Sequence, residues 1–318
     1  MKIVSCFSQL EEIKPLAEAG ADELYCAIPG LPSFGNSPCL EGRGALKMAV
    51  QAAHDRGLKL SLAVNGLTAL FTRKGEAKLL GRLAAADSAG VDAFIVAAPA
   101  VFALLSALKP RAKVHLSSVQ PCFNSLAAEF FISLGVSRII LPNQLAPFEA
   151  ASIIRLCRGR GVETEIFDYR FFGCAYINGR CHLHGPQYYT AKQLIPKGSM
   201  CRLDADLPVP RAINVAPAWK PGLGAITERL RSRFGCGGAP RLATSASFFD
   251  FFSGGVDYLK YGTRQDPAGA KVEKIRELRV MAGLAEKLCG TLPRAKARER
   301  FIRTMGNWRG GNSCNDGH

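Results

Sequence analysis

Hydrophobic and polar positions along the chain alternate between two patterns, one helical in spacing and one of short, continuous apolar runs. Four segments share the same order of features: small residues at a helix end, a glycine, an acidic or polar residue, and a short apolar strand. These segments are 18–29, 86–99, 132–143 and 253–262. Glycine suits the left-handed cap of a helix, and a continuously apolar strand suits a sheet that is covered on both faces. The pattern therefore predicts helices that each lead into a parallel strand.

Further elements are expected between these segments. The first residues of the chain indicate a strand, and other strands are predicted at Lys59–Asn65, Lys113–Gln120 and Glu163–Phe171, with Ala212–Ala216 as a further candidate. Helices are predicted at Ala45–Arg56, Glu76–Ala89, Ser125–Leu134 and Pro147–Arg160. Such alternation gives either a closed barrel or a doubly wound sheet. Eight strands can be counted and no G-x-G-x-x-G follows the first, which favours an α/β fold of the (β/α)8 TIM-like barrel type.

The regular pattern fails between residues 171 and 247, which are rich in glycine and proline. Long irregular stretches within compact domains usually carry function. We therefore predict one barrel domain over residues 1–290, with an irregular, cysteine-bearing insertion at 171–247 that runs across the barrel mouth. Residues 291–318 are basic and then rich in glycine, which predicts a frayed, solvated C-terminal tail.

Composition narrows the class of protein. The chain has 318 residues, of which 48% are hydrophobic and 21% charged, so a globular fold is expected and a disordered or fibrous one is not. No apolar signal segment follows Met1, and the longest uncharged stretch, 93–108, is shorter than the roughly 18–20 residues of a membrane span. We expect a cytoplasmic protein without a transmembrane segment. Its 11 cysteines are then better explained by metal binding, catalysis or packing than by disulfides.

The cysteines fall into two groups. Cys6, Cys26 and Cys157 lie in apolar strand or helix patterns and are expected to fill the core. Four others lie in the irregular insertion, three of them beside or near glycine: Cys174, Cys181, Cys201 and Cys236. Glycine beside a thiolate lets backbone amides approach cluster sulfurs, and the absence of C-x-x-C pairs favours an iron–sulfur cluster over a zinc knuckle. From spacing alone, scattered loop cysteines remain the alternative.

Residues 165–184 resemble the signature of the U32 family, long labelled collagenase-like peptidases. In that signature a Glu-x-Phe run leads to C-x4-G-x-C, and it is matched by Glu165, Phe167, Cys174, Gly179 and Cys181. The resemblance extends over most of the chain, through AGADELYCA, AVNG, GVDAFIVAAP, VHLSSVQPCFN and VDYLKYGTR, the last similar to the family's V-D-x-L-K-I-E-G-R. The chain departs from the family in four places. One extra residue precedes Cys174, His184 replaces a serine, Asn143-Gln144 replace Arg-Glu, and the glutamate of K-I-E-G-R is missing.

The resemblance implies a cofactor and a reaction. Several members of the family bind a 4Fe-4S cluster through four cysteines, and the order of Cys174, Cys181, Cys201 and Cys236 fits that pattern. Members support oxygen-independent hydroxylation with prephenate as the oxygen donor. Their substrates are ubiquinone precursors and bases of tRNA or ribosomal RNA, and the quinone-hydroxylating members act as pairs. The expectation is a 4Fe-4S oxidoreductase of the hydroxylase type that acts on a quinone precursor or an RNA base and pairs with a second U32 protein in a heterodimer.

In a parallel barrel the chemistry lies at the carboxyl ends of the strands. Asp168, Tyr169 and His115 are predicted there as catalytic residues. The predicted substrate-binding residues are Asn65, Gln120, Asn124, Lys260 and Arg264. Arg264 suits a bidentate contact with a carboxylate such as those of prephenate, and Lys260 suits a point charge. For each residue the alternative is ordinary barrel-rim structure, and for His115 a core histidine.

The net charge of +15, most of which lies after residue 160, attracts RNA, an anionic small molecule or an acidic partner without choosing among them. Two other functions stay open. One is a non-catalytic iron–sulfur partner in a heteromeric complex. The other is a peptidase, which is weakly supported because neither G-x-S-x-G nor H-E-x-x-H occurs.

Overall fold

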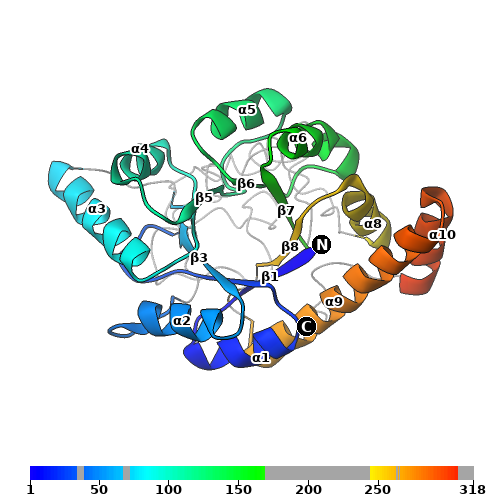
Figure 1. The fold of residues 1–318 in the computed structure, drawn as a ribbon, viewed down its shortest axis with the longest axis horizontal. Coiled ribbons are helices and arrows are strands. Elements are labelled where there is room, and N and C mark those ends of the chain that lie inside the picture. The colour runs from blue at the N-terminus through cyan, green and yellow to red at the C-terminus, as the bar shows by residue number, and fades with distance from the viewer. Residues whose placement is uncertain (34–38, 67–71, 169–243, 263, 265, 307–318) are drawn as a thin grey trace, which may run out of the picture.

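The computed structural model describes residues 1–33, 39–66, 72–168, 244–262, 264 and 266–306. Its centre is a closed barrel of eight parallel strands that pair in chain order, with β8 returning to β1 (Figure 1). The strands are β1 Lys2–Cys6, β2 Glu23–Cys26, β3 Lys59–Val64, β4 Ala93–Val96, β5 Lys113–Leu116, β6 Arg138–Ile140, β7 Glu163–Phe167 and β8 Tyr258–Tyr261. The predicted (β/α)8 barrel is confirmed.

Helices surround the barrel (Figure 1). They are η1 Leu10–Glu12, α1 Ile13–Glu18, α2 Ala45–His54, α3 Arg73–Ser88, α4 Pro99–Leu108, α5 Ser125–Ser133, α6 Pro147–Gly159, α8 Ser245–Gly254, α9 Ala268–Thr291 and α10 Arg294–Met305. The core lies mainly between these helices and the outward face of the strands, where Leu24, Leu60 and Phe94 are fully buried. No helix among the described residues is long and apolar enough to cross a membrane.

The four-fold repeat of the sequence has a structural basis. Its glycines, Gly20, Gly90, Gly135 and Gly255, all have positive φ angles between 85° and 100°, as a left-handed helix end requires. At Gly255 a Cβ atom would also meet the guanidinium of Arg158, so a larger residue there would require that side chain to move. The predicted helix-to-strand connections are confirmed.

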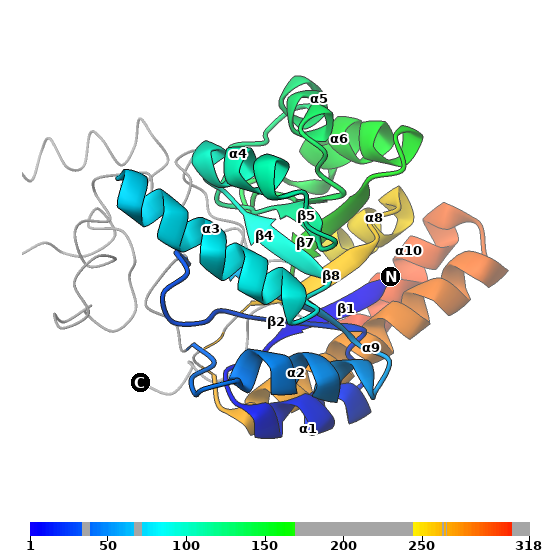
Figure 2. The ribbon, with the colours of Figure 1, turned by 60° about the vertical axis from the view of Figure 1, so that its left-hand side comes forward.

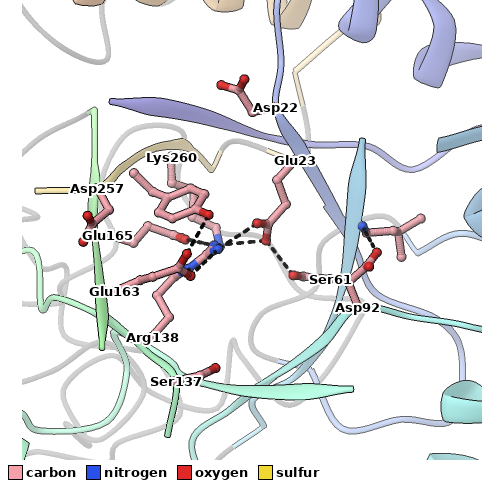
Figure 3. Close-up of polar contacts among 12 residues, drawn as sticks. Asp22, Glu23, Ser61, Asp92, Ser137, Arg138, Glu163, Glu165, Asp257 and Lys260 are labelled. Atoms are coloured by element: carbon pink, nitrogen blue, oxygen red, sulfur yellow. Dashed lines mark hydrogen bonds and ion pairs between the residues drawn. The ribbon is translucent and has the colours of Figure 1, made fainter. Parts of the chain in front are cut away.

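The polar residue of each repeat fastens one strand to its neighbour. Asp22, Asp92 and Asp257 each accept a 2.7 Å hydrogen bond through Oδ2 from the backbone amide of Ile3, Leu60 and Thr164, respectively. In the remaining repeat the Ser137 hydroxyl donates to the carbonyl oxygen of Val114 instead. These side chains lie at the amino-terminal end of the barrel and are labelled in Figure 3. Each of these residues stands just before an even-numbered strand and bonds to the backbone of the odd-numbered strand that precedes it in the chain.

Three predicted boundaries are corrected. Strand β5 ends at Leu116 rather than Gln120, because Ser117 and the residues after it form turns, with the Gln120 amide bonded to the Ser117 carbonyl. The described part of β7 ends at Phe167. Helix α8 begins at Ser245, inside the predicted insertion, because the Thr244 hydroxyl accepts the Ser247 amide and caps the helix. The possible strand at Ala212–Ala216 lies outside the described residues.

The predicted frayed tail is also corrected. Arg294–Met305 form helix α10, which lies beside α8 and α9 (Figures 1 and 2). Phe301 is fully buried, with its ring centroid 5.6 Å from Phe248 and 5.4 Å from Phe249, and Arg298 makes a bidentate contact with Asp250. The high content of Lys and Arg obscured the pair of apolar positions, Ala297 and Phe301, that dock this helix. Residues 307–318 lie outside the described part.

Candidate functional site

Polar side chains gather where the strands end, as the barrel fold requires. Asn65 follows β3 and donates through Nδ2 to the Ser117 hydroxyl, 2.9 Å away, which follows β5. Gln120 is half-buried in the turn after Ser117. Asn124 has another role, because its Oδ1 accepts the Ala127 amide at 2.9 Å and caps helix α5. Asn65 and Gln120 thus lie at the predicted end of the barrel, while Asn124 holds a helix.

Lys260 lies inside the barrel rather than at its rim. Its Nζ is 2.9 Å from Oε1 of Glu165 and 3.9 Å from the centroid of the Tyr25 ring. The Tyr25 hydroxyl in turn donates to the carbonyl oxygen of Gly262. The charge of this lysine is therefore balanced within the protein.

A network of buried charged side chains, centred on Arg138, lies inside the barrel (Figure 3). Nη1 of Arg138 donates to Glu165 at 2.9 Å, Nη2 donates to Glu23 at 2.9 Å, and Nε and Nη2 donate to Glu163 at 3.1 and 3.0 Å. The guanidinium also lies 3.5 Å from the centroid of the Tyr258 ring. Five charged groups, three negative and two positive with Lys260, thus share the interior.

Burial and charge oppose each other in this network. Burial by itself lowers the pKa of Arg138, but the carboxylates of Glu165 and Glu23 outweigh it and raise that pKa. Burial likewise acts to raise the pKa of Glu163, and the charge and hydrogen bonds of Arg138 outweigh it and lower that pKa. Glu165 and Glu23 thus favour the ionised form of Arg138, and Arg138 favours that of Glu163.

Sequence reasoning did not identify this network. The signal was present as polar or charged residues at alternate positions of short strands, Glu163 and Glu165 in β7 and Tyr258 and Lys260 in β8. Alternate residues of a strand share one face, so these side chains all point into the barrel. Arg138 and Glu23 gave no comparable signal, because each is a single charge beside an apolar run.

Asp168 faces away from the barrel interior. It follows the inward-pointing Glu163, Glu165 and Phe167 of β7, and its Oδ2 lies 4.0 Å from Nζ of Lys274 on the surrounding helix α9. Neither carboxylate oxygen of Asp168 has a hydrogen-bond partner among the described residues. Burial raises the pKa of Asp168 to about 7, against the lowering effect of Lys274. The group can exchange a proton near neutral pH, but it lies on the opposite face of the barrel wall from Lys260.

Of two further predicted residues, one follows β8 and the other lies outside the described part of the chain. Arg264 is 8% exposed and its charge acts on the buried thiols of Cys6 and Cys26. It lies just past the carboxyl end of β8, where a substrate carboxylate could be bound. Tyr169 is outside the described residues.

His115 lies toward the other end of the barrel. It is the third residue of β5, is 3% exposed, and lines a cavity that opens at the amino-terminal ends of the strands. Burial, together with the charges of Arg138 and Lys260, lowers its pKa well below the usual value, so the imidazole is neutral. The structure therefore does not bring together the two predicted catalytic residues that it describes, His115 and Asp168.

The cysteines divide largely as predicted. Cys6, Cys26 and Cys157 are fully buried, which confirms their place in the core, and Cys122 is buried as well. Burial raises the pKa of the Cys6, Cys26 and Cys122 thiols to about 12 and that of Cys157 to about 11. The described residues contain no cluster of His, Cys, Asp or Glu arranged to hold a metal ion. Outside the described residues lie the four predicted ligands, Cys174, Cys181, Cys201 and Cys236.

The sequence profile of peptidase family U32 matches residues 8–193, more than half of the chain. The chain belongs to peptidase family U32. The curated proteins that resemble this chain include two tRNA hydroxylation proteins. The tRNA hydroxylation protein P of Helicobacter pylori strain J99 is 29% identical over 208 residues, which are 64% of this chain and 46% of that protein. The tRNA hydroxylation protein P2 of Bacillus subtilis is 30% identical over 156 residues, 49% of this chain and 48% of that protein. This U32 chain thus spans about half the length of the curated relatives it matches.

Among solved structures, the U32 peptidase Mk0906 is similar over 52% of this chain and 68% of its own, with 18% sequence identity and a TM-score of 0.42. The U32 signature residues have definite positions in the present barrel. Glu165 binds Arg138 and Lys260, and the ring of Phe167 lies 5.7 Å from Nζ of Lys260. In this U32 protein the signature glutamate therefore joins the two buried cations.

Proposed function

We propose that this chain takes part in the hydroxylation of a base in tRNA. The observation that carries the proposal is the similarity over 208 residues to a tRNA hydroxylation protein. The formal charge of +15 is compatible with an RNA substrate, since phosphate groups are attracted to cationic surfaces.

We further propose that Cys174, Cys181, Cys201 and Cys236 hold a 4Fe-4S cluster. Thiolates bind iron, whereas thiols with strongly raised pKa values stay protonated. The four buried cysteines Cys6, Cys26, Cys122 and Cys157 are of the second kind. Bound there, a cluster would supply electron transfer or Lewis-acid activation of an oxygen group.

The chain's own residues bear on the oxygen donor, which we propose to be prephenate. A dicarboxylate is bound by cations at the end of the barrel where the substrate is expected. Lys260 is held by Glu165 inside the barrel, so its role is to maintain the interior network. Arg264, at the carboxyl end of β8, is the better candidate for contact with a substrate carboxylate.

The partner is proposed to be a second U32 chain. Bacillus subtilis has two similar proteins, named tRNA hydroxylation proteins P1 and P2, and this chain matches both.

The test is a strain that lacks the gene, with nucleosides from its tRNA measured by mass spectrometry. We expect loss of one hydroxylated nucleoside, and restoration by the wild-type gene and by Cys289→Ser. Cys289 is an exposed cysteine in α9 and serves as the matched control. Cys174→Ser and Cys236→Ser should not restore the nucleoside. A nucleoside profile that does not change, with a loss of hydroxylated quinone instead, would refute the RNA substrate.

The cluster is tested separately by anaerobic purification and assays of iron and sulfide. Wild-type and Cys289→Ser proteins should contain about four irons per chain. Cys236→Ser should lose most of this iron. Folded wild-type protein without iron would refute the cluster. An iron-containing protein whose loss changes no product would indicate the non-catalytic partner role.

A further inference from the structure

A cavity of about 350 Å³ opens at the amino-terminal end of the barrel, the end opposite to the expected chemistry. It forms because β4 contributes only a small side chain at that level. Ala93 lies in register with Ser61 of β3 and Lys113 of β5, and Gly90 precedes it. Barrel interiors are normally filled by large branched side chains, so a hollow here requires an explanation. Its volume lies within the range of small-molecule sites.

The acidic groups that line the cavity are already engaged. Glu23 and Glu163 are bound by Arg138, and Oδ2 of Asp92 accepts the Leu60 amide at 2.7 Å. Oδ1 of Asp87 accepts the Ala112 amide at 2.8 Å. None of these carboxylates needs a ligand for its charge.

Two cations of the lining are not engaged in this way. Lys59 and Lys113 are the first residues of β3 and β5, and they stand on either side of the small residues of β4. Neither makes an ion pair or a hydrogen bond with any residue that the structure describes. The side walls of the cavity are thus electrostatically balanced, whereas its rim carries two free ammonium groups.

The inner wall includes His115. The residue is only 3% exposed, and its Nδ1 has no hydrogen-bond partner among the described residues. A buried polar group that lacks a partner costs free energy, and a ligand or water in the cavity can remove that cost by fixing the ring tautomer. Burial, and then the charges of the neighbouring Arg138, Lys260, Lys113 and Lys59, disfavour the imidazolium, so the ring at this wall is neutral.

We propose that this cavity is a second binding site, for a small anionic metabolite with a carboxylate or phosphate group. Lys59 and Lys113 bind the anionic group, and His115 contacts the ligand from the inner wall. The site is separate from the carboxyl end of the barrel, and it does not depend on the proposed hydroxylation.

The test uses the full-length protein as purified. Sodium phosphate and sodium succinate are titrated in parallel by calorimetry, with sodium chloride at equal ionic strength as the reference. Because charge-assisted hydrogen bonds contribute about 1.5–3 kcal/mol each, the double variant Lys59→Gln/Lys113→Gln should weaken binding by about tenfold or more. The matched control is Lys47→Gln/Lys74→Gln, two exposed lysines on α2 and α3, which should bind as the wild type does. Preference for phosphate or for succinate identifies the anionic group.

A second measurement guards against variants that do not fold. The ¹⁵N signals of His115 in the wild-type protein should shift on addition of the bound anion. Absence of binding by both anions beyond the chloride reference would overturn the proposal. So would binding that is equal in both double variants, or binding that leaves the His115 signals in place.

Discussion

Replacement of Arg138 by methionine tests whether the buried charges act as one network. Methionine keeps the unbranched stem and removes the guanidinium, which donates to three carboxylates. Glu165 would keep Lys260, 2.9 Å away, and Glu163, with 31% of its side chain exposed, would be partly solvated. Glu23 would keep only the Ser61 hydroxyl, 2.6 Å away. One buried carboxylate is then left without a cation.

The expected loss follows from that count. Removal of one partner of a buried ion pair costs about 3–5 kcal/mol, because the remaining charge stays in a medium of low polarity. Domains have free energies of unfolding of about 5–15 kcal/mol, so the variant should lose about a fifth or more of its stability. Arg160→Met is the control. Arg160 pairs with Glu129 at 2.8 Å, but both side chains are more than half exposed, so the loss should be about 0–1 kcal/mol.

Urea unfolding followed by far-ultraviolet circular dichroism measures both variants. A second substitution sharpens the result, since Glu23→Gln should destabilise the wild type but stabilise Arg138→Met by about 1–2 kcal/mol. The reasoning is refuted if Arg138→Met and Arg160→Met lose equal stability, or if Glu23→Gln has the same sign in both backgrounds.

Three further changes test other parts of the structure. Asp168→Asn should gain stability relative to the wild type as pH rises from 5 to 8. The folded-state pKa of Asp168, about 7, lies above the unfolded value, so the wild type loses stability as pH rises through that window, by a few kcal/mol at most. Urea midpoints of the two proteins that differ equally at all pH values would contradict this. Phe301→Ala should lower the free energy of unfolding by about 3–5 kcal/mol, because the ring is buried against Phe248 and Phe249. In the control Phe148→Ala the replaced residue is 78% exposed, so the change should stay within about 0.5 kcal/mol. Equal melting temperatures of the two variants would mean that α10 is not part of the folded unit. Asp257→Ala should lower the free energy of unfolding by about 1.5–3 kcal/mol, because two hydrogen bonds from Thr164 are lost. Thermal unfolding measures this loss against the control Asp55→Ala, which removes only an exposed hydrogen bond from Gln51.

Much of the fold could be predicted because it depends on local pattern. The glycines at positions 20, 90, 135 and 255 mark helix ends whatever surrounds them, and continuous apolar runs after them indicate buried parallel strands. Helix α10 could not be predicted in this way. Its packing depends on two apolar positions among many charges, and only the facing phenylalanines of α8 make those positions decisive.

The site was predictable only where position along a strand decides the outcome. Asn65 lies at a strand end, as expected, and was correctly placed at the carboxyl end of the barrel. The positions of His115 and Asp168 in the barrel depend on which face of a strand each residue occupies and on where that strand ends. The sequence shows neither the face nor the strand end without the register of the sheet, and β5 is four residues shorter than the sequence indicated.

The sequence by itself determined the barrel, the repeat that closes each helix into a strand, and the membership of the U32 family, because these follow from spacing along the chain. The tertiary structure decided which charges meet. Arg138 and Glu23 are 115 positions apart in the chain, yet they bond at 2.9 Å, because closure of the barrel brings β2 and β6 to face each other across its interior. The same closure leaves Lys59, Lys113 and His115 around one cavity. Long-range contacts of this kind are properties of the closed sheet and not of any single segment.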